Sequence, residues 1–421
     1  FSVYADGASF CIMRRYLANK WPVNPDMVRI EEFLNYFTFD YPDPTDGNAV
    51  AINGEMGACP WNAEHKLLRL GIKGKPLAKE ETPKANFVFL VDVSGSMDSF
   101  DKLELLKSGL LELLPSLDPD DRISIVTYSG EVKLLLESTP VKNITKIQEA
   151  IKSLNADGAT NGGDAIRMAY REISSNYIPG GNNRIILGTD GDFNVGTTND
   201  RELVKLVEEG AAKGIYLTAL GFGSGNLNDA MMEKISNAGN GTYEYIDSEK
   251  QMMKVFVHER GKFNSVAADS KCQVTFNPAA VASYRLIGYE NRMLNAEDFD
   301  DDKKDAGEIG AGQTITALYE IIPAEGFVPG SDVNIATFDF RYKPALNEES
   351  IPLKLEIGSQ LSESENIRFA SGVAAFGLAM RDSKYRGTAT VTMARNLVGE
   401  SLTFDPNGYR KAFLELMAAI K

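Results

Sequence analysis

The sequence predicts an α/β protein in which a doubly wound, mostly parallel six-stranded sheet, with helices on both faces, is inserted in a β-sandwich-like flanking domain with C-terminal helices. Three observations support this prediction. Residues 85–261 alternate short apolar runs with segments of helical periodicity. The segments before and after them alternate apolar and polar residues as half-buried strands do. Oxygen-bearing side chains directly follow two of the central apolar runs.

The central segment predicts strands that are joined by helices. Parallel strands need long crossover connections, so this alternation predicts a mostly parallel sheet that is covered on both faces. Residues 129–132 are too few for a crossover, which places strand 132–136 antiparallel to strand 122–128 at an edge. The predicted strands are 86–91, 122–128, 132–136, 184–189, 215–220 and about 242–246.

Two of the central helices are marked by apolar stripes. One stripe consists of leucines three or four residues apart in 103–113. The other runs from Ile147 to Leu154 and is opened by the capping box Thr145-x-x-Gln148. Further helices are predicted near 163–175, 201–213, 228–238 and 249–259.

Residues 1–84 and 262–421 are predicted to flank the central domain 85–261 and to fold together. Residues 1–45 contain one helix-like segment, near 26–37, and two strands follow at 49–54 and 66–73. An isolated hairpin is marginally stable, so these strands are expected to pair with later ones. The later strands are predicted at 272–276, 282–289, 313–322, 332–342 and 351–357, and helices are predicted from 363 onward, at 389–398 and at 407–420.

Composition and charge exclude several classes of protein. The chain is 43% hydrophobic and 24% charged, and no apolar run approaches the length that spans a bilayer. Its net charge of −15 argues against a nucleic-acid partner, because phosphates would be repelled. The first residue is Phe1 and not an initiator Met, so we expect a removed or omitted leader.

Three scattered cysteines are too few for a disulfide scaffold or a zinc site. The pattern favours buried free thiols, while a bridge between Cys11 and Cys59 stays open.

The stretch Asn86–Met97, NFVFLVDVSGSM, carries the strongest chemical signal. Its apolar run predicts a buried strand, which ends in Asp92-x-Ser94-x-Ser96. Mg²⁺ prefers few carboxylates, neutral oxygens and retained waters. The strand end therefore predicts a site for a hard divalent cation.

This motif resembles the metal-ion-dependent adhesion site of von Willebrand factor type A domains. The resemblance implies a threonine on a second loop and an aspartate on a third. Thr160 in GATNGGD and Asp190 in IILGTDGDFN match them, and Gly191 would allow a tight turn beside the ion. In parallel sheets, ligands bind outside the carboxyl ends of the strands, where Asp92 and Asp190 are predicted to lie.

The resemblance also implies how such a site works. The two serines and usually the threonine bind the metal directly, the aspartates often act through water, and one position stays open for a partner's carboxylate. We expect magnesium, with calcium or manganese as alternatives. The implied partner is a protein that presents an Asp or Glu.

The flanks resemble a family of bacterial exported proteins, often lipoproteins. Members carry a central von Willebrand factor type A domain between an N-terminal segment and a C-terminal domain of unknown function. The resembling segments are VRIEEFLNYFTFDYPDP (28–44), CPWNAEHKLLRLGIKGK (59–75) and 284–313. The sequence Asp6-Gly7-Ala8-Ser9 departs from the Asp-Thr-Ala-Ser expected there. The resemblance implies a binding role in the bacterial cell envelope, periplasm or outer surface, with a lipid anchor on the missing leader.

Two alternative functions remain open. A hydrolase would use the same metal to activate water. However, the metal motifs contain no neighbouring Lys or Glu that could act as the general base. No G-x-S-x-G elbow or phosphate-binding loop occurs either. The other alternative is a scaffold for a separate motor ATPase, which requires a cytoplasmic chain. We therefore expect a binding protein that is not an enzyme and has no catalytic residues.

Overall fold

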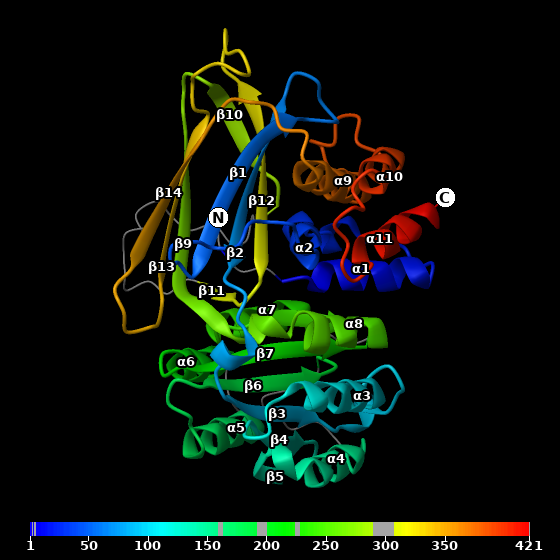
Figure 1. Cartoon of the computed structure of the whole chain (residues 1–421). Coiled ribbons are helices and arrows are strands. Elements are labelled where there is room, and N and C mark those ends of the chain that lie inside the picture. The colour runs from blue at the N-terminus through cyan, green and yellow to red at the C-terminus, as the bar shows by residue number, and fades with distance from the viewer. Residues whose placement is uncertain are drawn as a thin grey trace. The chain divides into compact units, whose positions relative to one another are not determined.

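Two compact units make up the chain (Figure 1). The flanking unit joins Phe1–Pro76 to Val266–Lys421, and the central unit is Leu77–Ser265. The predicted N-terminal segment 1–84 is therefore too long, because 77–84 belong to the central unit. The computed structural model describes all residues except 2, 4–5, 159–162, 192–199, 224–227, 289–306 and 421.

The central unit contains the predicted six-stranded sheet, in the order β5-β4-β3-β6-β7-β8. The short loop 129–131 forces β5 to run antiparallel to β4 at the edge, while the other neighbours pair in parallel. Every residue of β3 and β6 is buried, as expected for strands covered on both faces. The strands are β3 (Ala85–Asp92), β4 (Arg122–Tyr128), β5 (Val132–Pro140), β6 (Asn182–Thr189), β7 (Ile215–Phe222) and β8 (Tyr243–Ile246).

Helices cover both faces of this sheet (Figure 1). One group shares an apolar core with the sheet through side chains such as Leu106, Ile147 and Met252. It comprises α3 (Leu103–Leu113), α4 (Ile144–Lys152) and α8 (Glu249–Met253), which continues as a π-helical turn, Lys254–His258. The other group comprises α5 (Gly163–Ser175), α6 (Asp200–Ala211) and α7 (Asp229–Ala238).

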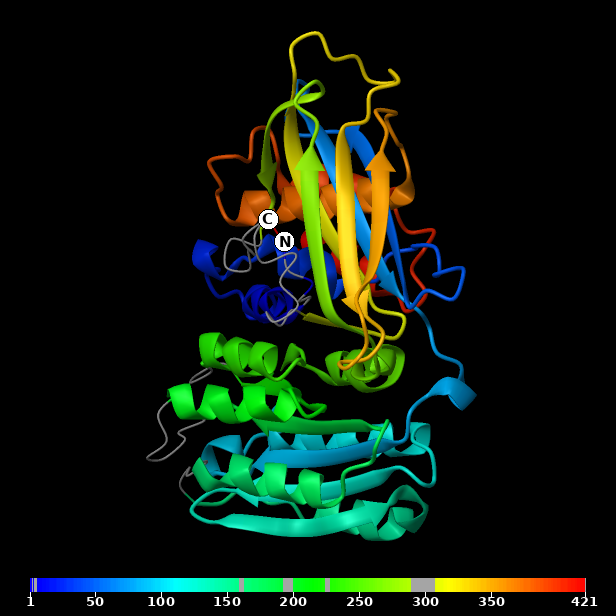
Figure 2. The same cartoon turned by 90° about the vertical axis from the view of Figure 1, so that its left-hand side faces the viewer.

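The flanking unit contains two four-stranded sheets with a shared apolar core (Figure 2). As predicted, the early hairpin joins a late strand, with Leu68 opposite Tyr319. The first sheet has the order β1-β2-β12-β10, with β1 (Val50–Ala58), β2 (Lys66–Gly74), β12 (Thr314–Pro323) and β10 (Val281–Leu286). The second has the order β11-β9-β13-β14, with β11 (Gly307–Gly310), β9 (Ser265–Phe276), β13 (Ala336–Lys343) and β14 (Ile351–Ile357).

Helices from both ends of the sequence pack together in the flanking unit (Figure 1). Aromatic rings join them: the Phe10 ring centroid lies 5.2 Å from that of Phe37 and 5.5 Å from that of Phe413. The expectation of a single helix in residues 1–45 was wrong, because α1 precedes α2. The helices are α1 (Ala8–Ala18), α2 (Ile30–Tyr36), α9 (Glu365–Met380), α10 (Val391–Gly399) and α11 (Tyr409–Ala418).

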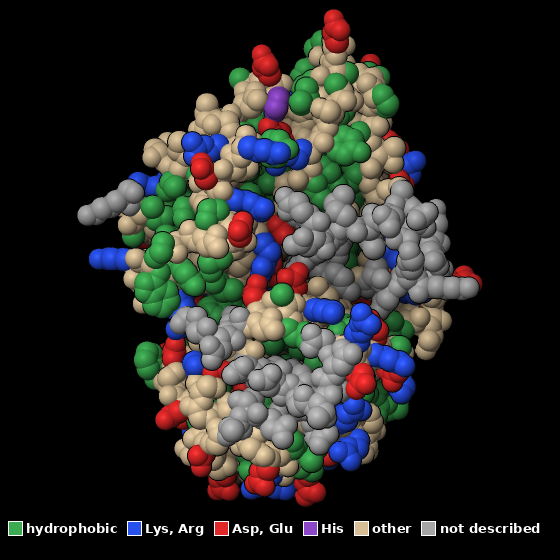
Figure 3. Space-filling view, turned by 180° about the vertical axis from the view of Figure 1, so that it is seen from behind, with side chains coloured by type: hydrophobic (Ala, Val, Ile, Leu, Met, Phe, Trp, Pro, Cys, Tyr) green, Lys and Arg blue, Asp and Glu red, His purple; other side chains and the backbone are tan. Residues whose placement is uncertain are grey.

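The three cysteines are buried free thiols, so Cys11 and Cys59 are not bridged. Among the described residues, no helix combines the length and the apolar character needed to cross a bilayer. Acidic and basic side chains are interspersed over the described surface in Figure 3.

Candidate metal centre

Strand pairing brings two of the predicted ligands together at the carboxyl ends of the strands of the central sheet. β3 and β6 are direct neighbours, with Val91 opposite Gly188. Asp92 ends β3 and Asp190 follows β6, so both carboxylates lie at the carboxyl ends of adjacent parallel strands. Both are buried, with 0% and 3% of their surface exposed.

The turn after β3 is organised around the Asp92 carboxylate. Its Oδ1 accepts a hydrogen bond from Ser94 N at 2.9 Å, and its Oδ2 accepts one from Thr189 Oγ1 at 3.0 Å. A 3-10 turn, Gly95–Met97, then brings Ser96 back toward Ser94. The two serine Oγ atoms lie 3.0 Å apart, so both hydroxyls are in reach of one small ion.

The second predicted loop reaches the same turn through its backbone. Asp157 N donates to Val93 O at 2.8 Å, and Gly95 N donates to Gly158 O at 2.9 Å. These bonds hold 157–158 against the Asp92–Ser96 turn. The predicted ligand Thr160 follows two residues later but lies outside the described residues.

The third loop turns tightly after Asp190. Gly191 has φ 97°, a left-handed conformation that disfavours side chains, and its N–H donates to Thr189 Oγ1 at 3.2 Å. Thr189 therefore links Asp92 to the Asp190 loop through one hydroxyl. This fully buried threonine was not among the predicted site residues, although its place directly before Asp190 marks it.

Lys102 is a second residue that the sequence did not assign to the site. Its Nζ lies 2.9 Å from Asp190 Oδ2 and donates to Ser96 O at 2.7 Å. The expectation that no lysine neighbours the metal motifs was therefore wrong. Lys102 stands six residues after Ser96, at the start of α3, and the turn Met97–Asp101 returns it to the site.

Burial shifts the pKa values of two groups at the site. It raises the pKa of the Asp92 carboxyl above its usual range, and the negative charge of Asp190 adds to this effect. The hydrogen bonds from Ser94 and Thr189 act in the opposite direction. Burial also raises the pKa of Tyr128, which keeps that hydroxyl neutral beside Asp92.

The described residues fit a hard divalent cation with few carboxylate ligands. Asp190 Oδ1 is buried and has no hydrogen-bond partner among them. An oxygen of this kind is costly unless something compensates it, and a cation would do so. No group of three or more His, Cys, Asp or Glu side chains in the described part suits a metal. Serine hydroxyls instead supply the neutral oxygens that Mg²⁺ accepts.

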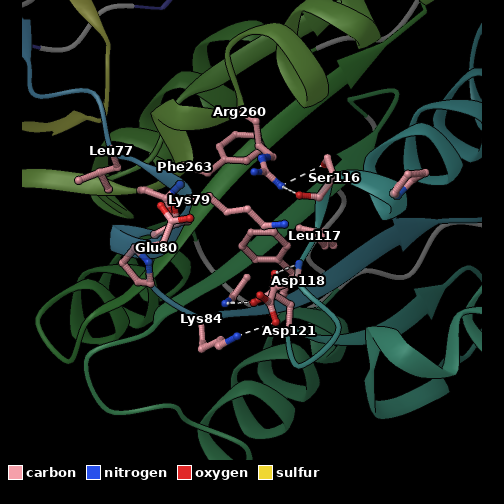
Figure 4. A pocket seen from close by; sticks show the side chains of 16 residues that line it. Leu77, Lys79, Glu80, Lys84, Ser116, Leu117, Asp118, Asp121, Arg260 and Phe263 are labelled. Carbon is pink, nitrogen blue, oxygen red and sulfur yellow. Dashed lines mark hydrogen bonds and ion pairs between the residues drawn. The ribbon is translucent and has the colours of Figure 1, made fainter.

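A cavity of about 620 Å³ lies at the amino ends of strands in the same sheet (Figure 4). Its lining includes Ala85 and Asp121, which stand at the amino ends of β3 and β4. Three of the charged groups on its wall are already bonded: Lys84 pairs with Asp118, and Arg260 donates to Ser116 O. This cavity is therefore distinct from the Asp92 site, and its bonds join segments near the start and the end of the central unit to the connection between α3 and β4.

Three family descriptions match this chain. Residues 87–192 match the von Willebrand factor type A domain, and residues 1–69 match a family described as von Willebrand factor. Residues 261–421 match the family described as "Uncharacterized protein YfbK, C-terminal".

Similar proteins support the same assignment. The chain is 37% identical over 442 residues to the protein YfbK of Escherichia coli (strain K12), which covers 99% of this chain and 77% of that one. It is 33% identical over 163 residues to inter-alpha-trypsin inhibitor heavy chain H4 of Homo sapiens, which covers 37% of this chain and 17% of that one.

A solved structure, "von Willebrand factor type A from Catenulispora acidiphila", shares the fold. It aligns with a TM-score of 0.50 and 16% identity over 89% of this chain and 90% of that chain. Together, the matches support a protein-interaction module in a bacterial protein.

Proposed function

Because this chain belongs to the von Willebrand factor type A domain family that includes Escherichia coli YfbK, we propose that it is a metal-dependent protein-binding module. Asp92, Ser94 and Ser96 would hold a divalent cation, with magnesium as the first choice. Thr160 and Asp190 would complete the site from the second and third loops. The cation would supply a positive charge that captures an Asp or Glu of a protein partner.

The buried Oδ1 atom of Asp190 is the observation that carries this proposal. It lies at the carboxyl edge of the sheet and has no hydrogen-bond partner among the described residues. The two hydroxyls in the facing turn lie only 3.0 Å apart. Hydroxyls leave most of a cation's charge uncompensated, so it would still attract an anionic ligand.

Binding without catalysis fits the site better than hydrolysis. A hydrolase needs a base that accepts a proton from water. The basic side chain at the site, Lys102, donates to Asp190 and to Ser96 O instead. A metal-dependent hydrolase and a scaffold for a separate motor ATPase are the two alternatives, and no observation in the described residues favours either.

We further propose that the protein works in the bacterial cell envelope, with a lipid anchor on a leader. The support is the resemblance of 28–44 and 59–75 to exported proteins. Fractionation of cells that make the full-length gene product checks this proposal. We expect the protein in the periplasmic or membrane fraction. Recovery in the cytoplasmic fraction alone would contradict it and favour the scaffold alternative.

Capture from envelope extract tests the binding role. The immobilised chain should retain a specific protein with Mg²⁺ and release it in EDTA. Replacing the partner's critical Asp or Glu by Asn or Gln should abolish retention. Raised salt should weaken the complex little, because the chain's net charge of −15 gives no long-range attraction to an acidic partner. Equal capture in EDTA would place the recognition surface elsewhere.

A further inference from the structure

Lys102 extends from the start of α3 to the candidate metal site. Its backbone is fixed on both sides, because Lys102 N donates to Ser99 O at 3.1 Å and Leu106 N donates to Lys102 O at 2.9 Å. The side chain of Lys102 is 20% exposed, whereas the side chain of Asp190 is 2% exposed. The ammonium group therefore reaches from the surface to a buried carboxylate.

The end of β7 leaves room for the lysine stem. A Cβ atom on Gly223 would lie 2.5 Å from Lys102 Cε, so a side chain there would collide with the stem. Gly223 has φ 74°, and Tyr245 OH donates to its carbonyl oxygen. The path of Lys102 is thus shaped by a second strand end and does not depend on the ion pair alone.

The ammonium group binds two residues of the candidate site, but through other oxygens than the Asp190 Oδ1 and the Ser96 hydroxyl that would face a cation. Its Nζ lies 2.9 Å from Asp190 Oδ2 and 2.7 Å from Ser96 O. A divalent ion bound between Asp190 and Ser96 would stand within a few ångströms of this positive charge, and the two would repel strongly at partly buried positions. Lys102 therefore opposes the binding of a divalent ion at Asp190.

We propose that Lys102 is a built-in competitor that sets the affinity of the site for divalent cations. Its ammonium group offsets the negative charge of Asp190 and repels a divalent ion that binds beside it. The apparent affinity for Mg²⁺ is then lower than the same ligands would give without the lysine. This inference rests on the proposed metal function and adds the residue that regulates it.

Calorimetric titration of the whole chain with Mg²⁺ tests the competition. Lys102→Met keeps the length of the side chain and removes its charge, so it should bind Mg²⁺ about tenfold tighter than wild type or more, the value of one charge-assisted hydrogen bond. Lys107→Met is the matched control. Lys107 lies on the same helix, but its Nζ bonds to Glu104 and Leu154 O, so its loss should leave the affinity unchanged.

Thermal unfolding gives a readout that does not depend on heat of binding. In EDTA, Lys102→Met should unfold at a lower temperature than wild type, because Asp190 has lost its counter-ion. With Mg²⁺ it should gain more in melting temperature than wild type gains. Lys102→Arg keeps the charge and should retain the affinity of the wild type.

Three outcomes would overturn the proposal, and they differ from one another. Equal or weaker Mg²⁺ binding by Lys102→Met, with normal binding by wild type, removes the competition and leaves the metal site intact. Binding by Lys102→Arg as tight as by Lys102→Met shows that charge is not the cause. A lack of Mg²⁺ binding by both the wild type and Lys102→Met removes the proposed metal function as well.

Discussion

Phe100 is the large hydrophobic residue with the highest exposure among the described residues, at 87%. It lies in the turn between Ser96 and Lys102, which is held by the bonds Ser99 N to Met97 O and Lys102 N to Ser99 O. An exposed aromatic ring on a hydrogen-bonded turn beside a proposed partner site is typical of an interface residue. Its exposure therefore suggests a contact with an apolar side chain next to the partner's Asp or Glu.

We predict that Phe100→Ala weakens partner capture about tenfold and leaves Mg²⁺ affinity unchanged. The control is Tyr177→Ala, because Tyr177 is also an exposed aromatic residue of the central unit but follows α5 at the amino end of β6. Surface plasmon resonance with the captured partner measures both variants. If Phe100→Ala and Tyr177→Ala bind equally well, Phe100 is not part of the interface.

The sequence predicted the ligands Asp92, Ser94, Ser96 and Asp190 because each follows an apolar run that ends abruptly. The structure brings these residues to one edge, while Thr160 stays a prediction. Lys102 and Thr189 escaped notice for physical reasons. A lysine at the start of a helix usually points into solvent, and only the return of Met97–Asp101 brings this one to Asp190.

At the scale of elements, the end of α8 holds a buried ionic cluster. Glu259 accepts from Lys254 and pairs with Lys262, around the π-helical turn Lys254–His258. Burial opposes the charge of Glu259, but the two ammonium groups outweigh it and lower the pKa of Glu259 from 4.5 to about 2. Burial lowers the pKa of Lys254 although Glu259 acts against it, so the pair is held at a cost in desolvation.

This cluster predicts how stability depends on pH. A carboxylate whose pKa is lower in the folded chain stabilises the fold above the unfolded pKa and loses that effect as the pH falls. The difference in free energy of unfolding between wild type and Glu259→Gln should therefore narrow from pH 4.5 down to about 2. Urea denaturation at a series of pH values measures it. A constant difference over that range would show that Glu259 is not charge-stabilised.

Elements whose apolar residues recur with one clear period were predicted well, whereas elements that depend on tertiary contacts were not. The boundaries of β4 and α3 match the predicted ranges, because their apolar residues recur at the spacing of a strand and of a helix. In α1, Arg14 and Arg15 interrupt the apolar pattern, so the helix depends on packing of Phe10 against α2 and α11. β9 begins at Ser265, seven residues before the predicted start, because its first half contains Asp269 and Lys271, which are buried as an ion pair.

At the scale of the whole molecule, the division into two units predicts that the central unit folds independently. Leu77–Ser265 contains its own sheet and both helical layers, so this fragment should fold alone. A chain without residues 1–76 lacks β1 and β2, which leaves β12 as an unpaired edge and should aggregate. Circular dichroism and size-exclusion chromatography compare the two products. If the fragment 77–265 is disordered while the chain without residues 1–76 is well folded, this division into units is wrong.

The proposed divalent cation site at Asp92, Ser94, Ser96, Thr160 and Asp190 is the central claim. Calorimetric titration of the whole chain with Mg²⁺ tests it most directly, using Ser96→Ala because Ser96 is exposed and its loss leaves the core intact. Ser153→Ala is the control, since Ser153 is an exposed serine at the end of α4. We predict one Mg²⁺ per wild-type chain, affinity at least about tenfold weaker in Ser96→Ala, and no change in Ser153→Ala. Equal Mg²⁺ binding by Ser96→Ala and wild type would contradict the account.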